Sequence, residues 1–214
     1  MVARINVCVA IAFVALGVAG CGGSSKDVRG RKQLIQLLAV LRRPQTKADR
    51  NPAMLRTIER QPQWSPYVAN GSRPDLALVR LGTIGPWGAR ILLVPFTPPT
   101  SVPHCTGTER ACARPPPREE TLAVFPSSGA RKWTAAQIAA GVAFTQTPSD
   151  GRWIIVVPDA VTRVAFVLSD RRPTVVVRGN VAAVQGHAGE RIDAALWYGA
   201  HGRLLRRIRA GFNL

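Results

Sequence analysis

The sequence is poor in the residues and motifs that carry most enzyme chemistry. It holds three histidines and twelve acidic residues in 214 positions. It contains no glycine-rich phosphate loop, no paired CxxC units, no HExxH helix and no GxSxG elbow. These absences remove the usual sequence signatures of nucleotide-binding proteins, zinc enzymes and serine hydrolases. We therefore expect no cofactor, no metal and no catalytic residue, and we interpret the chain as non-enzymatic.

The few candidate catalytic side chains fall where loops and turns are expected. His104 lies in a proline-rich segment and His201 in a glycine-flanked turn, so exposed loop positions are the simpler interpretation of both. Glu119 and Glu120 are adjacent, and neighbours on a strand point to opposite faces, so they cannot form a facing acid and base pair. A hydrolase whose site is assembled from residues remote in sequence stays open as an alternative.

Lysine is scarce, whereas arginine is abundant. Lysine supplies four of the 29 cationic side chains, and the net charge is +17. A surplus of this size raises a positive potential that attracts anions. The densest cationic clusters predict the anion-binding residues, with a merely solvated surface as the alternative. These residues are Arg42, Arg43, Arg206, Arg207 and Arg209.

The sequence also lacks an apolar run of membrane-spanning length at its N-terminus. The run before Cys21 has about 14 residues, short of the roughly 20 that a spanning helix requires. It follows a single cation, Arg4, and ends in small residues, with no acidic residue in between. This is the pattern of a secretory signal. It predicts that residues 1–20 direct export and are then removed.

The end of this signal carries a resemblance. The junction Val18-Ala19-Gly20-Cys21 resembles the lipobox of bacterial lipoproteins, with an aliphatic residue three positions before the cysteine and two small residues next to it. The resemblance implies that Cys21 receives a diacylglycerol and that the mature chain is anchored at the extracytoplasmic face of the cell membrane. Residues 21–27 would be the lipidated cysteine and a flexible tether. The alternative is an ordinary cleaved signal that happens to end near a cysteine.

This location decides which partners we expect. Lipid headgroups and wall polymers are the abundant polyanions outside the membrane, whereas nucleic acid would suit a cytoplasmic protein of this charge. The leading hypothesis is a non-catalytic binding or scaffolding module of the cell envelope that docks on an anionic polymer, lipid or protein. An extracytoplasmic hydrolase is the first alternative. A basic polyanion or nucleic-acid binder is the second, and the export signal argues against it.

Two further cysteines fit an oxidising compartment. Cys105 and Cys112 can pair across a short loop, and a disulfide is the default outside the cytoplasm. The competing interpretation is a metal site in which His104 joins the two thiolates. Structural zinc takes four ligands at tighter paired spacing, so we expect the disulfide.

Helical patterns occupy the first part of the mature chain. Leucines at helical spacing predict a helix over 28–42, which Pro44 ends. Asn51-Pro52 is a good start for a second helix that runs to about Arg60. Residues 28–62 are therefore expected to form a helical hairpin.

Strand patterns occupy the rest, from 75 to 210. Strands at 76–81 and 91–96 around the turn 85–88 predict a β-hairpin, and a proline-rich loop follows at 97–120. Thr134 and Gln137 form a capping box that opens a short helix, which Gly141 ends. We expect an α+β fold dominated by β-structure, in which the helical hairpin packs on an antiparallel β-sandwich or small barrel. A further strand is predicted at 121–125. The remaining predicted strands form a meander over 153–157, 161–168, 174–178, 181–185, 194–198 and 204–209, the last as an edge strand.

Short segments of the body carry a second resemblance. Val157 to Val161, Arg178 to Val181, Leu196 to Tyr198 with Gly202-Arg203, and Leu41 to Thr46 resemble uncharacterised secreted proteins of high-GC bacteria. The resemblance covers about half of the chain. It implies a shared fold, and it provides no activity that can be transferred to this chain.

Overall fold

The protein is described by a computed structural model. It describes residues 33–51, 56, 58, 60, 71–84, 89–100, 119–125, 131–147, 151–187 and 190–209. The predicted signal peptide, Cys21 and its tether, the predicted disulfide between Cys105 and Cys112, and most of the proline-rich loop lie outside these residues. None of the helices in the described part of the chain combines the length and apolarity needed to traverse a bilayer.

The fold is α+β with β-structure dominant, as predicted. Three antiparallel sheets form it. Sheet A has the order β1-β2-β3-β4, sheet B the order β5-β6-β9, and sheet C the order β11-β10-β7-β8. The strand bounds are β1 Arg80–Ile84, β2 Ala89–Phe96, β3 Thr121–Phe125, β4 Lys132–Thr134, β5 Phe144–Gln146, β6 Arg152–Val156, β7 Arg163–Leu168, β8 Thr174–Val176, β9 Val181–Gln185, β10 Ile192–Tyr198 and β11 Leu204–Arg209.

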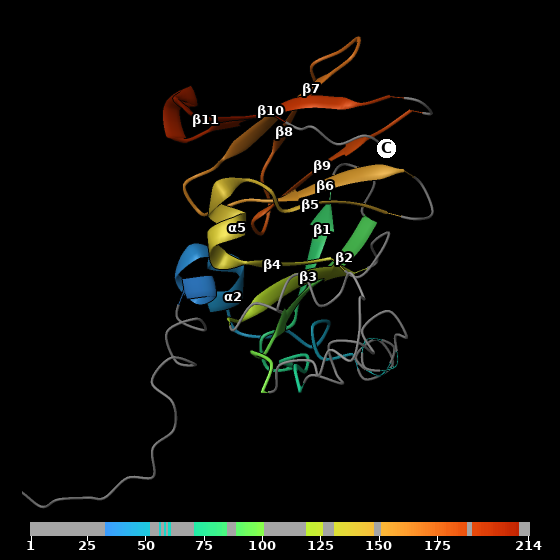
Figure 1. Cartoon of the computed structure of the whole chain (residues 1–214), viewed down its shortest axis with the longest axis vertical. Coiled ribbons are helices and arrows are strands. Elements are labelled where there is room, and N and C mark those ends of the chain that lie inside the picture. Colours follow the sequence, from blue (N-terminus) through green and yellow to red (C-terminus); the bar gives the residue numbers. More distant parts are fainter. Residues whose placement is uncertain are drawn as a thin grey trace, which may run out of the picture.

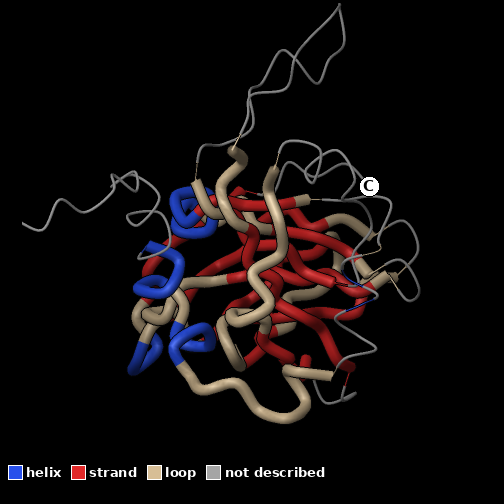
Figure 2. The backbone as a smooth tube through the Cα atoms, turned by 90° about the horizontal axis from the view of Figure 1, so that it is seen from below, coloured by secondary structure: helices blue, strands red, loops and turns tan. Residues whose placement is uncertain are grey.

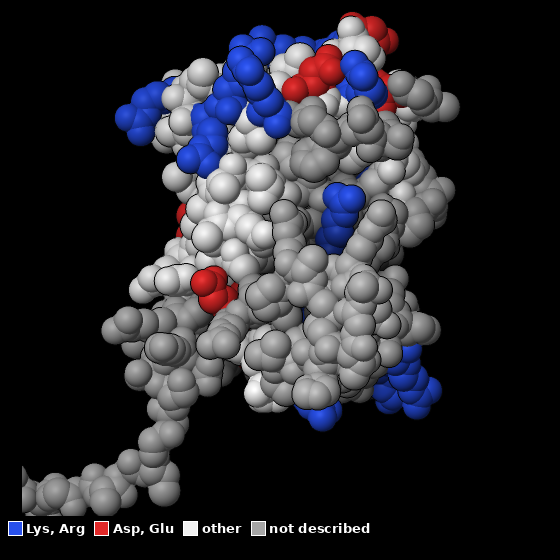
Figure 3. Space-filling model, viewed as in Figure 1, with Lys and Arg blue, Asp and Glu red and all other residues white. Residues whose placement is uncertain are grey.

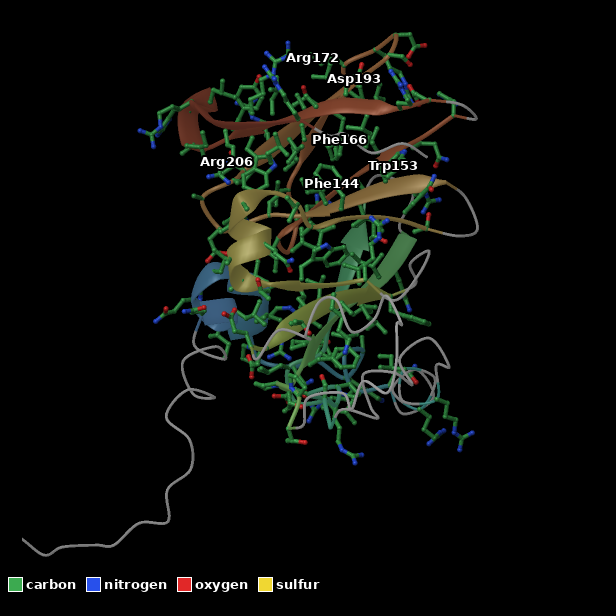
Figure 4. The ribbon with its side chains drawn as sticks, in the orientation of Figure 1. Phe144, Trp153, Phe166, Arg172, Asp193 and Arg206 are labelled. Carbon is green, nitrogen blue, oxygen red and sulfur yellow. The ribbon has the colours of Figure 1, made fainter. Side chains whose placement is uncertain are left out.

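Sheet B lies between the other two sheets (Figure 1). Successive side chains of a strand point to opposite faces. Ile154 and Val156 of β6 accordingly pack with sheet A, whereas Trp153 and Ile155 pack with sheet C. Phe144, Trp153 and Phe166 fill the layer between sheets B and C (Figure 4). Burial on both faces explains why β6 is apolar without alternation.

A smaller apolar cluster covers the face of sheet A that points away from sheet B. Leu92 and Val94 of β2 contribute to it, together with Ile58 and Val79 from the preceding segment. The helices lie along one side of the strands (Figure 2). Among the described residues, each sheet face thus has a covering apolar layer, except the outer face of sheet C.

Most predicted strands are confirmed, but their order differs from a meander. β3 and β9 have the predicted bounds. β1 and β2 form the predicted hairpin, but β1 spans Arg80–Ile84, whereas its strand was predicted at 76–81. β6 pairs with β9, and β7 pairs with β10. The barrel prediction is wrong, because the sheets are stacked and open. Two short strands, β4 and β5, were not predicted.

The first predicted helix is present but interrupted. Residues 33–37 are helical, Leu38 is extended, and α2 Ala39–Arg42 follows. No glycine or proline lies here, so the break has a tertiary cause. The carboxylate of Asp159 accepts the N–H of Ala39, and the Asn180 carbonyl oxygen accepts the N–H of Val40 at 2.9 Å. These two side chains cap α2 from outside the helix.

The second predicted helix falls mostly outside the described residues. Residues 56 and 58 are helical, and Ile58 is buried. The packing of a two-helix hairpin therefore stays a prediction. The helix after Thr134 is confirmed as α5 Ala135–Ala140, with the complete capping box and Gly141 in the left-handed conformation at its end.

Candidate anion-binding surface

One face of sheet C packs against sheet B, and the outer face carries exposed side chains such as Arg163, Val176 and Leu204. Val164, Phe166 and Leu168 of β7 point into the core with sheet B. The alternating positions, which include Arg163, therefore lie on the outer face. β11 is the edge strand, as predicted, and most of its side chains are exposed.

The strand register places apolar and cationic side chains in one row on this face. Leu204 pairs with Tyr198, Tyr198 with Arg163, and Arg163 with Val176, so the row crosses all four strands. Leu204 is 53% exposed and Val176 is 59% exposed. Large apolar side chains at this exposure are not part of the core. They flank the centre of the row and project from the sheet.

More arginines surround the row. Arg207 pairs with Leu196 and Arg209 with Ala194, which places both on the same outer face. Arg172 donates a hydrogen bond from Nη2 to the Tyr198 hydroxyl at 2.9 Å. We call this surface the sheet C face. It comprises Arg163, Arg172, Val176, Tyr198, Leu204, Arg207 and Arg209.

The charge of the sheet C face is largely uncompensated. Lys and Arg side chains gather over sheet C, with acidic side chains beside them (Figure 3). Within the described part of the chain, no ion pair involves Arg163, Arg207 or Arg209. The exposed carboxylate of Asp193 is 3.9 Å from its nearest arginine partner, Arg191. The face therefore presents cations that are available to an external anion.

A second carboxylate near sheet C is neutralised. Glu190 is 6% exposed and its Oε2 lies 2.7 Å from Nη2 of Arg171. The hydrogen bonds from Arg171 and from the backbone N–H of His187 lower the pKa of Glu190 to about 2. The charge of this carboxylate is thus compensated by Arg171 and does not neutralise the arginines of the sheet C face.

Arg206 lies on the other side of its strand, although the sequence grouped it with Arg207 and Arg209. It pairs with Trp197, whose side chain is in the core. Its Nη1 donates to the carbonyl oxygen of Ala139 at 2.7 Å, near the end of α5 (Figure 4). A cation at a helix C-terminus is favourable. Arg206 therefore secures α5 to the edge of sheet C.

Arg42 and Arg43 also lie away from the sheet C face. Arg42 donates to the carbonyl oxygens of Ile35 and Gln36 and pairs with Asp159. Arg43 forms a two-pronged bond with Asp49, at 2.7 and 2.8 Å. Both guanidinium groups hold the N-terminal segment on the core. Their role as anion-binding residues stays a prediction.

The carboxylate of Asp49 organises this segment. It is 1% exposed and also accepts hydrogen bonds from the N–H groups of Leu81 and Thr46. Burial raises its pKa, but the donated bonds, led by that of Arg43, outweigh burial and hold the pKa well below its usual range. Arg80, 4% exposed, donates to the carbonyl oxygens of Arg43 and Leu41 nearby.

The described residues offer no cluster of metal-ligating side chains. They contain no group of three or more His, Cys, Asp or Glu side chains that could hold a metal ion. His201 is exposed, in the short 3-10 turn η3 Ala200–Gly202, and has a left-handed φ of 57°. His104 lies outside the described residues.

Lys132 has a perturbed pKa outside the sheet C face. Burial lowers its pKa from 10.5 to about 7, and its Nζ lies 3.3 Å from the centre of the Phe96 ring. Above pH 7 the unfolded chain keeps a proton that the folded chain releases. The free energy of unfolding should therefore rise with pH, by about 3 kcal/mol between about pH 7 and pH 9.5. Lys132→Met should remove this rise in urea titrations, and the exposed control Lys47→Met should retain it. An unaltered rise in Lys132→Met would contradict the assignment.

Comparison of the chain with models of protein families, with curated proteins and with solved structures finds no match. The surface chemistry described above is therefore the basis for a functional assignment.

Proposed function

We propose that this chain is a lipid-anchored extracytoplasmic protein whose sheet C face rests on anionic lipid headgroups, as a non-catalytic binding module of the cell envelope. The anchor is the lipid that Cys21 would receive, since residues 18–21 resemble a lipobox. The observation that carries the proposal is the row of exposed apolar and cationic side chains across four strands. The proposed arrangement combines a covalent lipid with a basic patch, and stable membrane binding usually needs two such signals.

The composition of the sheet C face favours a lipid surface over a polymer. Arginine near an anionic bilayer gains about 1 kcal/mol from the surface potential. Val176 and Leu204 project between the arginines and could enter the boundary between headgroups and acyl chains. A soluble anionic polymer offers no apolar layer for them.

The length of the segment between Cys21 and the first described residue is compatible with this contact. The N–H of Asp159 donates to the carbonyl oxygen of Leu37 at 3.1 Å, so the first described helix lies beside the loop that leads into β7. Twelve positions separate Cys21 from Gln33. At 3.3 to 3.6 Å per residue, such a segment reaches at most about 40 Å. A lipid on Cys21 can therefore lie in the same membrane that the sheet C face contacts.

Vesicle binding tests the proposal. Mature chain carrying Cys21→Ser, which lacks the anchor, should bind phosphatidylglycerol vesicles at low salt and not phosphatidylcholine vesicles, as measured by co-sedimentation. Arg163→Gln/Arg207→Gln/Arg209→Gln should weaken this binding about 100-fold, at about 1 kcal/mol for each arginine. Arg73→Gln/Arg131→Gln/Arg178→Gln, which removes the same charge from exposed positions outside both basic sites, is the control and should bind as the parent does.

Two outcomes would overturn the proposal. Equal losses in the two triple variants would mean that net charge, and not the sheet C face, drives binding. Val176→Ser/Leu204→Ser should weaken vesicle binding about tenfold because apolar area is lost from the contact. If it binds vesicles normally and anionic wall polymer more tightly than vesicles, the partner is the polymer.

A further inference from the structure

A hollow of about 740 Å³ lies far from the sheet C face and is lined by cations. Its described lining is Lys47, Ala48, Arg50, Asn51 and Arg90. We propose that this basic hollow binds a phosphate-bearing ligand. The site is independent of the proposed membrane contact, since it shares no residue with the sheet C face.

One wall of the basic hollow is a turn that is fixed to sheet A. Residues 47–50 form the turn, and Asp49 at its centre points inward. Its carboxylate accepts the N–H of Leu81 at 2.6 Å and bonds to Arg43. Lys47 and Arg50, on either side of Asp49, are exposed. The turn is thus held in place by its acidic residue, while its cations face solvent.

The opposite wall is the start of β2. Arg90 is exposed and alternates with Leu92 and Val94, so it lies on the face of sheet A that points away from sheet B. Leu92 pairs with Leu81, the residue to which the turn is bonded. Lys47, Arg50 and Arg90 therefore converge although about 40 residues separate them in sequence, and the backbone that holds them is tied together.

The electrostatics of the hollow favour an anion. None of its described lining residues is acidic. Asp49, the carboxylate closest in sequence, is 1% exposed and is neutralised by Arg43. The described residues that line this concave surface therefore do not compensate its three cations. Asn51 adds an amide that can both donate and accept hydrogen bonds.

The donor set fits phosphate better than a single carboxylate. Guanidinium groups bind phosphate through two parallel hydrogen bonds, and lysine supplies a compact charge. Three cations match an anion that carries more than one negative charge. The volume lies in the range of small-molecule sites. A phosphorylated small molecule or the phosphate of a lipid headgroup would meet these requirements.

The two basic sites lie at opposite ends of the stack of sheets. The hollow belongs to the outer side of sheet A, and sheet B separates sheet A from sheet C (Figure 1). Ligands at the two sites can therefore be tested separately, and the failure of one proposal leaves the other standing.

Calorimetric titration with inorganic pyrophosphate tests the hollow. Mature chain carrying Cys21→Ser should bind one equivalent with a submillimolar dissociation constant at low salt. Lys47→Gln/Arg90→Gln should weaken binding at least tenfold, whereas Arg73→Gln/Arg131→Gln, with the same loss of charge at exposed positions outside both basic sites, should not. All four substituted residues are exposed, and an unchanged thermal unfolding midpoint verifies that each variant is folded.

Companion titrations identify the source of the phosphate. Weaker binding of glycerophosphoglycerol than of pyrophosphate supports a free, multiply charged phosphate, and equal binding supports a lipid headgroup. Citrate has comparable charge without phosphorus, so citrate binding as tight as that of pyrophosphate would overturn the assignment to phosphate. Equal affinity of the Lys47→Gln/Arg90→Gln variant and the parent would overturn the site.

Discussion

Asp49→Asn should lower the free energy of unfolding by about 3 to 5 kcal/mol, because it breaks a buried ion pair and leaves Arg43 without its carboxylate. The native carboxylate accepts two bonds from Arg43 and one each from the N–H groups of Leu81 and Thr46. An amide keeps only one oxygen, and its NH₂ group would face donors. Urea denaturation at neutral pH measures the loss.

The pH dependence of the free energy of unfolding separates the loss of the charge from a steric effect of the amide. The pKa of Asp49 is depressed in the folded protein, so its contribution is present above its usual value of 3.8 and is lost as the pH falls below that value. The difference in the free energy of unfolding between the parent and Asp49→Asn should therefore become smaller at acidic pH. The control is Asp193→Asn, whose exposed pair with Arg191 should contribute less than about 1 kcal/mol. A difference that stays constant down to low pH would contradict a stabilising role of the ionised Asp49 carboxylate.

The sequence predicted elements that depend on local chemistry. The capping box at Thr134 and the left-handed Gly141 need only neighbouring residues, and both are confirmed. The β1–β2 hairpin was predictable because two apolar strands flank turn residues. The edge position of β11 was predictable from its row of arginines.

Long-range order was not predictable in the same way. β6 and β9 are apolar on both faces, so their sequence pattern does not indicate which strand pairs with them. They pair although β7 and β8 lie between them in sequence. β4 and β5 have three residues each, too few for a period to be recognised. The break at Leu38 depends on Asp159 and Asn180, more than 100 residues away.

The residues of the candidate sites were likewise predictable where they are clustered in sequence, and not where long-range contacts bring them together. Arg207 and Arg209 were found by their density in sequence, but density alone could not tell that Arg206 points the other way. Arg163 and Arg172 were missed because only the strand register brings them to Tyr198. The resemblance of the segment from Leu41 to Thr46 to secreted proteins stays a prediction. In the structure, Arg43 and Gln45 of this segment donate hydrogen bonds to the carbonyl oxygens of Leu81 and Val79.

Gly141→Ala should destabilise the fold by about 3 kcal/mol through two separate costs. Gly141 has a φ of +85°, where an alanine is strained by about 1 to 2 kcal/mol. A Cβ here would also lie 2.1 Å from Cδ1 of Ile208 and 3.2 Å from Cζ2 of Trp197. Ile208 is 8% exposed, so relief of this overlap disturbs the contact between α5 and sheet C, at about 1 to 3 kcal/mol.

Gly151→Ala is the matched control for the backbone cost. Gly151 has a φ of +66°, but the nearest atom to a new Cβ, Nε2 of Gln146, is 3.6 Å away. It should lose only about 1 kcal/mol, from strain alone. A double-mutant cycle with Ile208→Ala isolates the steric cost, because Gly141→Ala should be about 2 kcal/mol less harmful in that background. If the cycle shows no coupling, the overlap is relieved elsewhere. Strong coupling would mean that the end of α5 is held by the packing of Ile208 against it.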